Sequence, residues 1–203
     1  MGGINMILMF IGPSSSGKDF FYRKATKKYN LKEITLYTTR PKRNGEIDGR
    51  EYFFISDKEM DELDVNNNLV ERRDYNTKHG IWSYATRGDD IDYIKDNYIV
   101  INTWEGYQKY IEYFGMDNVI PIYIDVNYNT RTERAIKREM KQENPKYNEL
   151  RRRFIFDRVD FKREYIEKYN PIIIDNNKTK EYALKQLYDN LDEILNVKKY
   201  NKK

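Results

Sequence analysis

The sequence predicts an α/β domain in which a central parallel β-sheet is flanked by helices. Short apolar and β-branched runs, which are typical of buried strands, recur with helix-length segments between them. A glycine-containing loop directly follows the first run, and the last helix-length segment carries apolar residues at spacings of three and four. Strands that alternate with helices form parallel sheets. The runs are residues 4–11, 33–37, 98–102, 119–124 and 172–174.

The remaining segments predict the helices and one change of pattern. Ser56 and Glu59 have the spacing of a capping box and should open a short helix, and Asn129-Thr130 can cap a helix that runs through residue 138. Between residues 38 and 91 the pattern changes to short strands and loops, which we interpret as an insertion between strands of the sheet. The last helix should end before a frayed tail, residues 198–203. The apolar face of this last helix consists of Leu184, Leu187, Tyr188, Leu191, Ile194 and Leu195.

Length and composition exclude several classes of function. A chain of 203 residues can bury the core of one globular unit, and the absence of cysteine rules out disulfides and thiolate catalysis. The single histidine, His79, cannot build a histidine-rich metal site and is expected on a surface loop. The longest apolar run is too short to span a bilayer, so we expect a cytoplasmic protein with no membrane partner. The net charge of +4 is dispersed along the chain, so no nucleic acid is expected as a partner.

The loop after the first predicted strand has the pattern of a phosphate-binding P-loop. Its residues run Gly12-Pro13-Ser14-Ser15-Ser16-Gly17-Lys18, and a predicted helix follows at once. Glycines let the backbone turn so that its N–H groups surround phosphates, and the helix N-terminus adds positive potential. Lys18 would neutralise the β- and γ-oxygens of ATP and act in catalysis. The candidate ATP-binding residues are Gly12, Ser14, Ser15, Ser16, Gly17, Lys18 and Asp19.

Asp19 departs from the usual P-loop pattern, which has Ser or Thr as a magnesium ligand after the lysine. A carboxylate is also a hard oxygen ligand, so Asp19 can hold Mg²⁺ directly or through water. It also brings negative charge close to the phosphates. Because Lys18 and both glycines are retained, we predict a working ATP site with Mg²⁺ as the cofactor and Asp19 as its metal ligand.

Residues 37–54 supply a second candidate anion site. The run Y-T-T-R-P-K-R-N-G-E-I-D-G-R-E-Y-F-F places Arg40 and Arg43 three residues apart and Tyr52 beyond them. Two guanidinium forks and a phenol suit the dianionic phosphate of a nucleoside monophosphate. The run resembles the guanylate kinase signature T-T-R-x-x-R-x-G-E-x-x-G-x-x-Y. The resemblance implies that these three residues bind the phosphate of the acceptor.

The resemblance continues at the base-binding positions, with departures. Glu71, in Leu69-Val70-Glu71, is similar to the glutamate that accepts bonds from guanine N1 and N2, although it can also be a surface carboxylate. Tyr84, or else Trp82, matches the family's phosphate-binding tyrosine, and either ring can instead belong to the core. Two guanine contacts are altered: Leu36 and Tyr37 stand where the family has a serine, and Asn102 stands where it has an aspartate.

Arginines in the second half of the chain resemble the family's lid. Arg134 and Arg138, four apart, match R-L-x-x-R, and Arg153-Phe154 begins a run that is similar to R-L-x-x-A-x-x-E. A transferring phosphoryl group spreads charge over its oxygens, and arginines on a closing lid stabilise that charge. The resemblance therefore implies catalytic roles for Arg134, Arg138 and Arg153. Asp175 or Asn176, at the end of the last strand, is expected near the adenine of ATP.

Taken over nearly the whole chain, the resemblance implies a P-loop kinase fold with an inserted subdomain for the nucleoside monophosphate and a lid. Residues 1–37 and 92–203 would form the core, 38–91 the insertion and about 135–155 the lid. The expected reaction moves the γ-phosphoryl group of ATP to GMP or dGMP. Leu36, Asn102 and the insertion before Trp82 leave open another small phosphorylated acceptor, and Asp19 leaves open a catalytically silent binding module.

Overall fold

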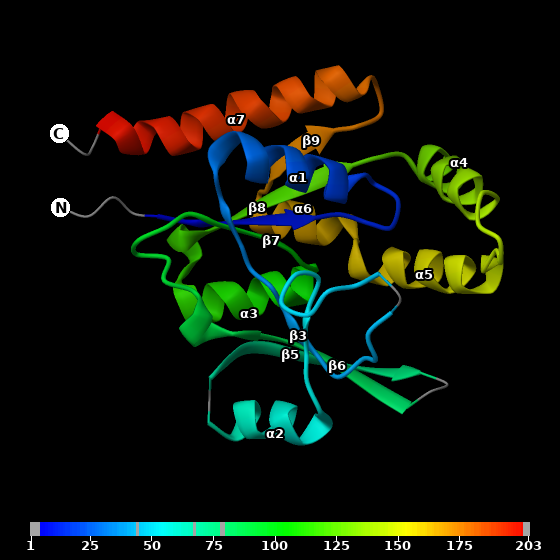
Figure 1. Ribbon diagram of the computed structural model, residues 1–203. Coiled ribbons are helices and arrows are strands. Elements are labelled where there is room, and N and C mark those ends of the chain that lie inside the picture. Colours follow the sequence, from blue (N-terminus) through cyan, green and yellow to red (C-terminus); the bar gives the residue numbers. More distant parts are fainter. Residues whose placement is uncertain (1–4, 44, 67, 78–79, 201–203) are drawn as a thin grey trace.

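Strands and helices alternate through the first and last parts of the chain, as the sequence predicts (Figure 1). The computed structural model describes residues 5–43, 45–66, 68–77 and 80–200. The strands are β1 Ile7–Ile11, β2 Lys32–Glu33, β3 Tyr37–Thr38, β4 Phe53–Phe54, β5 Leu69–Thr77, β6 Gly80–Arg87, β7 Tyr98–Ile101, β8 Val119–Asp125 and β9 Ile172–Asp175. The helices are α1 Lys18–Tyr29, α2 Asp57–Val65, α3 Trp104–Phe114, α4 Tyr128–Glu139, α5 Tyr147–Asp160, α6 Arg163–Tyr169 and α7 Lys180–Tyr200, with 3₁₀ turns η1 Gly88–Asp90 and η2 Met116–Asn118.

A parallel sheet forms the centre of the molecule, with strand order β2-β7-β1-β8-β9. All of its neighbouring strands are parallel. Every residue of β1 is buried, which explains why this strand reads as a continuous apolar run rather than an alternating one. The predicted fold class is confirmed. Because β1 lies between β7 and β8, the loop after Ile11 leaves the sheet at the edge where parallel strands end and ligands bind.

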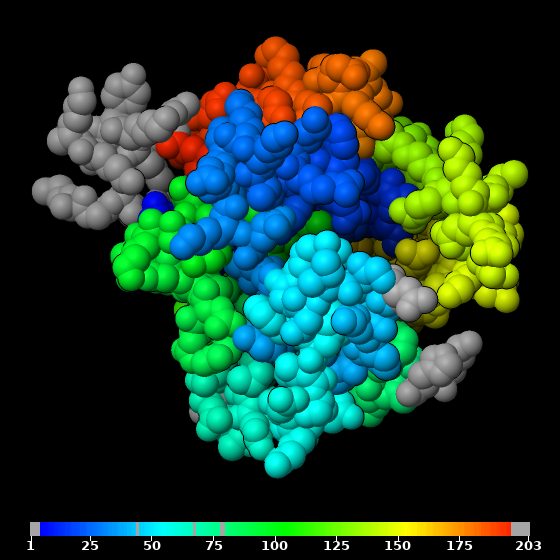
Figure 2. All heavy atoms as spheres, in the orientation of Figure 1, coloured from blue at the N-terminus to red at the C-terminus, as the bar shows by residue number. Residues whose placement is uncertain are grey.

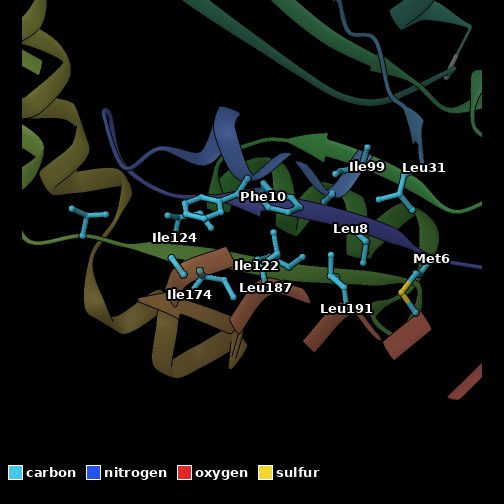
Figure 3. Close-up of a cluster of buried hydrophobic side chains, with 14 residues drawn as sticks. Met6, Leu8, Phe10, Leu31, Ile99, Ile122, Ile124, Ile174, Leu187 and Leu191 are labelled. Carbon is cyan, nitrogen blue, oxygen red and sulfur yellow. The ribbon is translucent and has the colours of Figure 1, made fainter. Parts of the chain in front are cut away.

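The two faces of this sheet are covered by different helices (Figure 1). On one face, Leu8 and Phe10 of β1 pack with α1 and α7, where Leu187 and Leu191 are fully buried (Figure 3). On the other face, the alternate β1 residues pack against α3 and α6. Trp104 is the largest side chain there, and its ring stacks on Tyr169 with a centroid distance of 5.5 Å. The hydrophobic core therefore has two layers, one on each side of the sheet.

A second, smaller sheet has the strand order β4-β3-β6-β5 and is built only from residues between 37 and 87. Its long antiparallel pair, β5 and β6, extends beyond the short strands that the sequence pattern suggests. Helix α3 joins the two sheets, since the hydroxyl of its buried Tyr110 donates to Thr86 Oγ1 of β6 at 2.9 Å. This bond links the second sheet, through α3, to the main sheet.

Three local expectations are wrong. The run 33–37 is not one strand: β2 pairs with β7 in the main sheet, and β3 pairs with β6 in the second, because apolar pattern does not specify a partner strand. Helix α4 begins at Tyr128 with Asn127 as its N-cap residue, ahead of the expected cap. Helix α7 continues to Tyr200, through the first half of the expected tail.

Other expectations are met or cannot be examined. The capping box at Ser56 and Glu59 is confirmed. Ile4 and His79 lie outside the residues that the structure describes. In the part of the chain that the structure describes, no helix is both long and apolar enough to cross a membrane.

Candidate active site

The loop between β1 and α1 has the backbone of a phosphate cradle. Gly17 adopts φ 93°, a conformation that favours glycine, and a Cβ there would lie 3.0 Å from Asn176 Nδ2. A Cβ on Gly12 would lie 3.0 Å from Ser16 Oγ and 3.1 Å from the Ile124 carbonyl oxygen. Both glycines are therefore required by local geometry. The loop ends at Lys18, the first residue of α1, so the helix N-terminus faces the cradle.

A buried ion pair braces this loop from the side. The Asp157 carboxylate of α5 accepts hydrogen bonds from the Ser14 backbone N–H at 3.0 Å and from Ser14 Oγ at 3.1 Å. Arg131 of α4 donates to the same carboxylate at 2.8 Å and to the Ser14 carbonyl oxygen at 3.0 Å. The side chains of Arg131 and Asp157 are only 9% and 8% exposed. Two helices that follow β8 are thus bonded to the start of the cradle.

Lys18 and Asp19 follow the cradle in different surroundings. Burial lowers the pKa of Lys18 below its usual range, and the charges of Asp19 and Asp157 offset only part of this effect. The Lys18 ammonium lies 3.5 Å from the Pro13 carbonyl oxygen, at the limit of a hydrogen bond, which leaves its donors available to an anion. Asp19, in the first turn of α1, is exposed. A lysine side chain and an exposed carboxylate are therefore neighbours at the start of α1.

Arg134 and Arg138 lie on α4 and reach the same loop region. Arg134 Nη2 donates to the Asn176 carbonyl oxygen at 3.1 Å, and Arg138 Nη2 lies 3.3 Å from Ser15 Oγ. Asn176 is buried, and its Nδ2 donates to the Ser16 carbonyl oxygen at 2.8 Å. Asn176 thus fixes the backbone of the loop at Ser16. The guanidinium groups of Arg134 and Arg138 lie beside this loop.

Arg153 lies one turn before Asp157 on α5 and shares its helix face. Its Nε is buried and makes no hydrogen bond to the residues that the structure describes. The pKa of the neighbouring Glu149 is lowered, mainly by Arg152, with further contributions from Arg153 and from Arg43. Arg43, in the loop between β3 and β4, therefore contributes positive potential at Glu149 of α5. On the face seen in Figure 2, the blue, cyan and yellow-green segments that carry these groups gather together.

Arg40 is the centre of a second cationic cluster, and it is 3% exposed. Its guanidinium group lies 5.4 Å from the centroid of the Tyr52 ring and forms a two-armed pair with Glu46, at 2.8 and 3.1 Å. Burial disfavours the charge, but Glu46 outweighs it and holds the pKa of Arg40 above its usual value. The backbone N–H of Arg43 donates to the same Glu46 at 2.7 Å. Arg40 is thus buried and held by an ion pair, whereas the Arg43 side chain is exposed.

The tyrosines of this cluster settle which of two candidate rings adjoins it. The Tyr84 ring packs against Tyr52 with a centroid distance of 5.6 Å. Trp82 lies two residues earlier on β6, opposite Tyr75 of β5. Burial raises the pKa of Tyr52, so its hydroxyl stays a neutral donor at physiological pH. Tyr84, rather than Trp82, therefore lies beside Arg40 and Tyr52.

The other end of the second sheet carries the expected base-binding residues. Glu71 is 4% exposed, and its Oε1 accepts from Thr86 Oγ1 and from Asn102 Nδ2, each at 3.2 Å. Arg73, which the sequence patterns do not mark, bonds to both oxygens of Glu71, at 2.6 and 3.2 Å. Asn102 Oδ1 accepts from the Thr103 N–H at 2.9 Å, so the amide of Asn102 both donates and accepts. The altered residue Leu36 lies apart from this network, where its carbonyl oxygen accepts from the Phe53 N–H at 2.9 Å.

Sequence reasoning assigned no role to three residues of this region. Asp157 lies in the run that begins at Arg153, but the sequence does not show that it pairs with Arg131, 26 positions earlier. Arg73 stands beside Arg72 in the sequence, and only its position on β5 distinguishes it from a solvated arginine. Strand periodicity is the signal that could have identified Arg73, because residues two apart in a strand lie on the same face, which places Arg73 beside Glu71.

Several known proteins resemble this chain in sequence or in fold. The model of the family described as guanylate kinase matches residues 5–194. The guanylate kinase of Gloeobacter violaceus is 38% identical over 69 residues, 34% of this chain and 34% of that protein. The guanylate kinase of Anaplasma phagocytophilum is 27% identical over 124 residues, 60% of this chain and 58% of that protein. The chain thus aligns with less than two thirds of the length of these relatives. A crystal structure of guanylate kinase from Anaplasma phagocytophilum has the same fold, with a TM-score of 0.54 at 21% identity over 98% of this chain and 87% of that one.

Proposed function

Because this chain belongs to the guanylate kinase family, we propose that it transfers the γ-phosphoryl group of ATP to GMP or dGMP, giving ADP and GDP or dGDP. The observation that carries the proposal is the presence of two separate groups of cationic side chains in one chain, one around Lys18 in the loop after β1 and one around Arg40. A kinase needs both, because the triphosphate donor and the monophosphate acceptor must be bound together for in-line transfer.

We assign the two substrates to the parts of the chain that contain the two sheets. Residues 1–37 and 92–203 form the core that binds ATP, and residues 38–91 form the subdomain that binds the monophosphate. Residues from about 135 to 155 act as the lid. Support comes from the second sheet, whose strands all lie between residues 37 and 87, and from the bonds by which α4 and α5 reach the cradle.

In the donor site, the N–H groups of Ser15, Gly17 and Lys18 would hold the β- and γ-phosphates, and the Lys18 ammonium would neutralise the charge that develops during transfer. Arg134, Arg138 and Arg153 would stabilise the transferring group. Asn176 would keep the cradle in shape through its bond to Ser16. No general base is required, because the acceptor is already a phosphate anion.

A magnesium ion would reduce the negative charge of the β- and γ-oxygens. The residues present fit a site that is completed by the nucleotide: the described residues contain no group of three or more acidic, histidine or cysteine side chains that could enclose a metal. Mg²⁺ typically keeps several waters and binds one or two carboxylates besides substrate phosphates. Asp19, exposed beside Lys18, is the carboxylate that we assign to this role.

In the acceptor site, Arg40, Arg43, Tyr52 and Tyr84 would bind the monophosphate, and the end with Glu71 and Asn102 would face the base. The rigid Arg40–Glu46 pair supports this assignment, because a guanidinium group that is already oriented loses little freedom on binding a phosphate. The cytoplasmic location expected from the sequence stays a prediction.

A coupled assay of ADP release, run with a panel of ribo- and deoxynucleoside monophosphates, tests the proposal. We expect ADP release that depends on GMP or dGMP and on Mg²⁺. Release that depends on a different phosphorylated compound would contradict the acceptor assignment. No release with any member of the panel, from protein that still binds ATP, would contradict the enzymatic function and favour a silent binding module.

A further inference from the structure

Groups of the protein itself occupy most of the acceptor positions of the Glu71 carboxylate. Arg73 Nε donates to Oε2 at 2.6 Å and Arg73 Nη2 to Oε1 at 3.2 Å. Oε1 also accepts from Thr86 and from Asn102, each at 3.2 Å. Each carboxylate oxygen offers about two acceptor positions, so these bonds fill Oε1 and leave one position on Oε2. Glu71 could accept from two neighbouring N–H groups of a base only by displacing one of these buried partners.

Arg73 lies on the face of the second sheet that carries the acceptor cluster. It is directly opposite Tyr84 in the antiparallel pair of β5 and β6, and opposite residues project to the same face. Tyr84 packs against Tyr52, which lies under Arg40. Arg73 is therefore placed between the phosphate cluster at one end and Asn102 at the other, where the base of a bound monophosphate would lie.

The guanidinium of Arg73 keeps donors for a ligand. Its side-on edge, Nε and Nη2, is occupied by Glu71, and Nη1 makes only a long contact of 3.5 Å to Thr103 Oγ1. Each terminal nitrogen carries two N–H groups, so within the described residues one N–H on Nη1 and one on Nη2 remain open. The side chain is 13% exposed, so these donors are largely desolvated but still reachable.

We propose that Arg73 is the residue that reads the acceptor's base and that Glu71 is a positioning residue that orients it; this rests on the function proposed above. Two neighbouring N–H groups match two neighbouring acceptors, and guanine offers such a pair at O6 and N7. Adenine has a donor amino group in place of O6, so it would meet one of the two donors with another donor. Guanine selection then depends on the O6 and N7 edge of the base.

The adjacent Arg72 provides a contrast and a matched control. Arg72 points to the other face of β5, where its guanidinium bonds to Asp61 at 2.8 Å, Asp64 at 3.2 Å and Asp74 at 3.1 Å. These carboxylates join β5 to α2 and account for Arg72 structurally. Arg73 has one carboxylate partner in the described part of the chain, and its remaining donors face the acceptor side.

The test compares GMP with 7-deaza-GMP, in which a C–H group replaces N7. Steady-state kinetics and calorimetric binding without ATP would be measured for the wild type, Arg73→Met, Arg73→Lys and Arg72→Met. The wild type should prefer GMP about ten-fold to a hundred-fold, because a bond to a charged donor is lost with the analogue. Arg73→Met should reduce GMP use and remove the preference. Arg73→Lys keeps a positive charge beside Glu71, so it controls for misfolding caused by an unpaired buried carboxylate. It should also lose the preference for GMP, because lysine lacks the planar pair of donors.

Arg72→Met should keep the wild-type ratio. Equal use and equal binding of GMP and 7-deaza-GMP by the wild type would overturn the assignment, as would a preference that survives both Arg73 variants. Absence of turnover alone would reject the proposed function instead, and the ratio of the two binding constants would still decide the role of Arg73.

Discussion

Replacing Arg131 by methionine should destabilise the protein strongly, because it leaves the Asp157 carboxylate buried without its counter-charge. Both residues are nearly buried, at 7% and 8% exposure, and their atoms lie 2.8 Å apart. Removing one partner of a buried pair costs about 3–5 kcal/mol. For a chain of this length, that corresponds to a fall in Tm of about 6–20 °C. The double variant Arg131→Met/Asp157→Leu should regain much of the loss, because apolar replacement of both partners is often nearly neutral.

Urea unfolding of the wild type, both single variants and the double variant gives the coupling energy directly. We expect about 2 kcal/mol or more of coupling, with the double variant still below the wild type because the Ser14 N–H loses its acceptor. Arg152→Met is the control, since its pair with Glu149 is 55% and 45% exposed and should contribute less than about 1 kcal/mol. If Arg131→Met loses no more stability than Arg152→Met, or if the double variant is no more stable than Arg131→Met, the Arg131–Asp157 pair does not stabilise the loop at Ser14.

Other predictions concern the two proposed substrate sites. Lys18→Met should lower phosphoryl transfer by orders of magnitude, and it should leave stability at neutral pH equal or higher. Because burial lowers the pKa of Lys18, the unfolded state holds the lysine proton more tightly than the folded state does. The destabilisation that the buried charge causes in the wild type therefore shrinks as pH rises toward the ordinary lysine pKa. Turnover equal to the wild type in a folded variant would refute the loop assignment. Asp19→Asn should weaken activity and its magnesium dependence, whereas Asp19→Ser should retain more of both; identical magnesium titrations for Asp19→Ala and the wild type would remove Asp19 from the metal site. Glu71→Gln should reduce kcat/KM for GMP about thirty-fold or more while the KM for ATP changes little, because it breaks the fork that orients Arg73; unchanged GMP kinetics would exclude Glu71 from the acceptor site.

Features that are encoded by neighbouring residues were predictable. The cradle needs a strand, a loop with two glycines and a lysine, and a helix start, and all of these are contiguous from residue 7 to residue 29. The parallel sheet was equally evident, because its buried strands are apolar throughout and are separated by helices. Arg40 and Tyr52 follow from a run of residues whose spacing is short and fixed.

Local sequence alone determined this much of the protein: a parallel α/β core, a glycine-containing loop that leads into a helix at Lys18, and the run of residues that supplies Arg40 and Tyr52. The tertiary structure decided which sheet β3 joins, which ring lies beside Tyr52, and that Asp157 braces Ser14 across 143 positions of the chain. It also decided that Arg73, rather than its neighbour Arg72, turns toward Glu71 and the acceptor side. The physical reason is that periodicity and motif spacing record contacts within a few residues, whereas a hydrogen bond between distant segments depends on packing that no single segment contains.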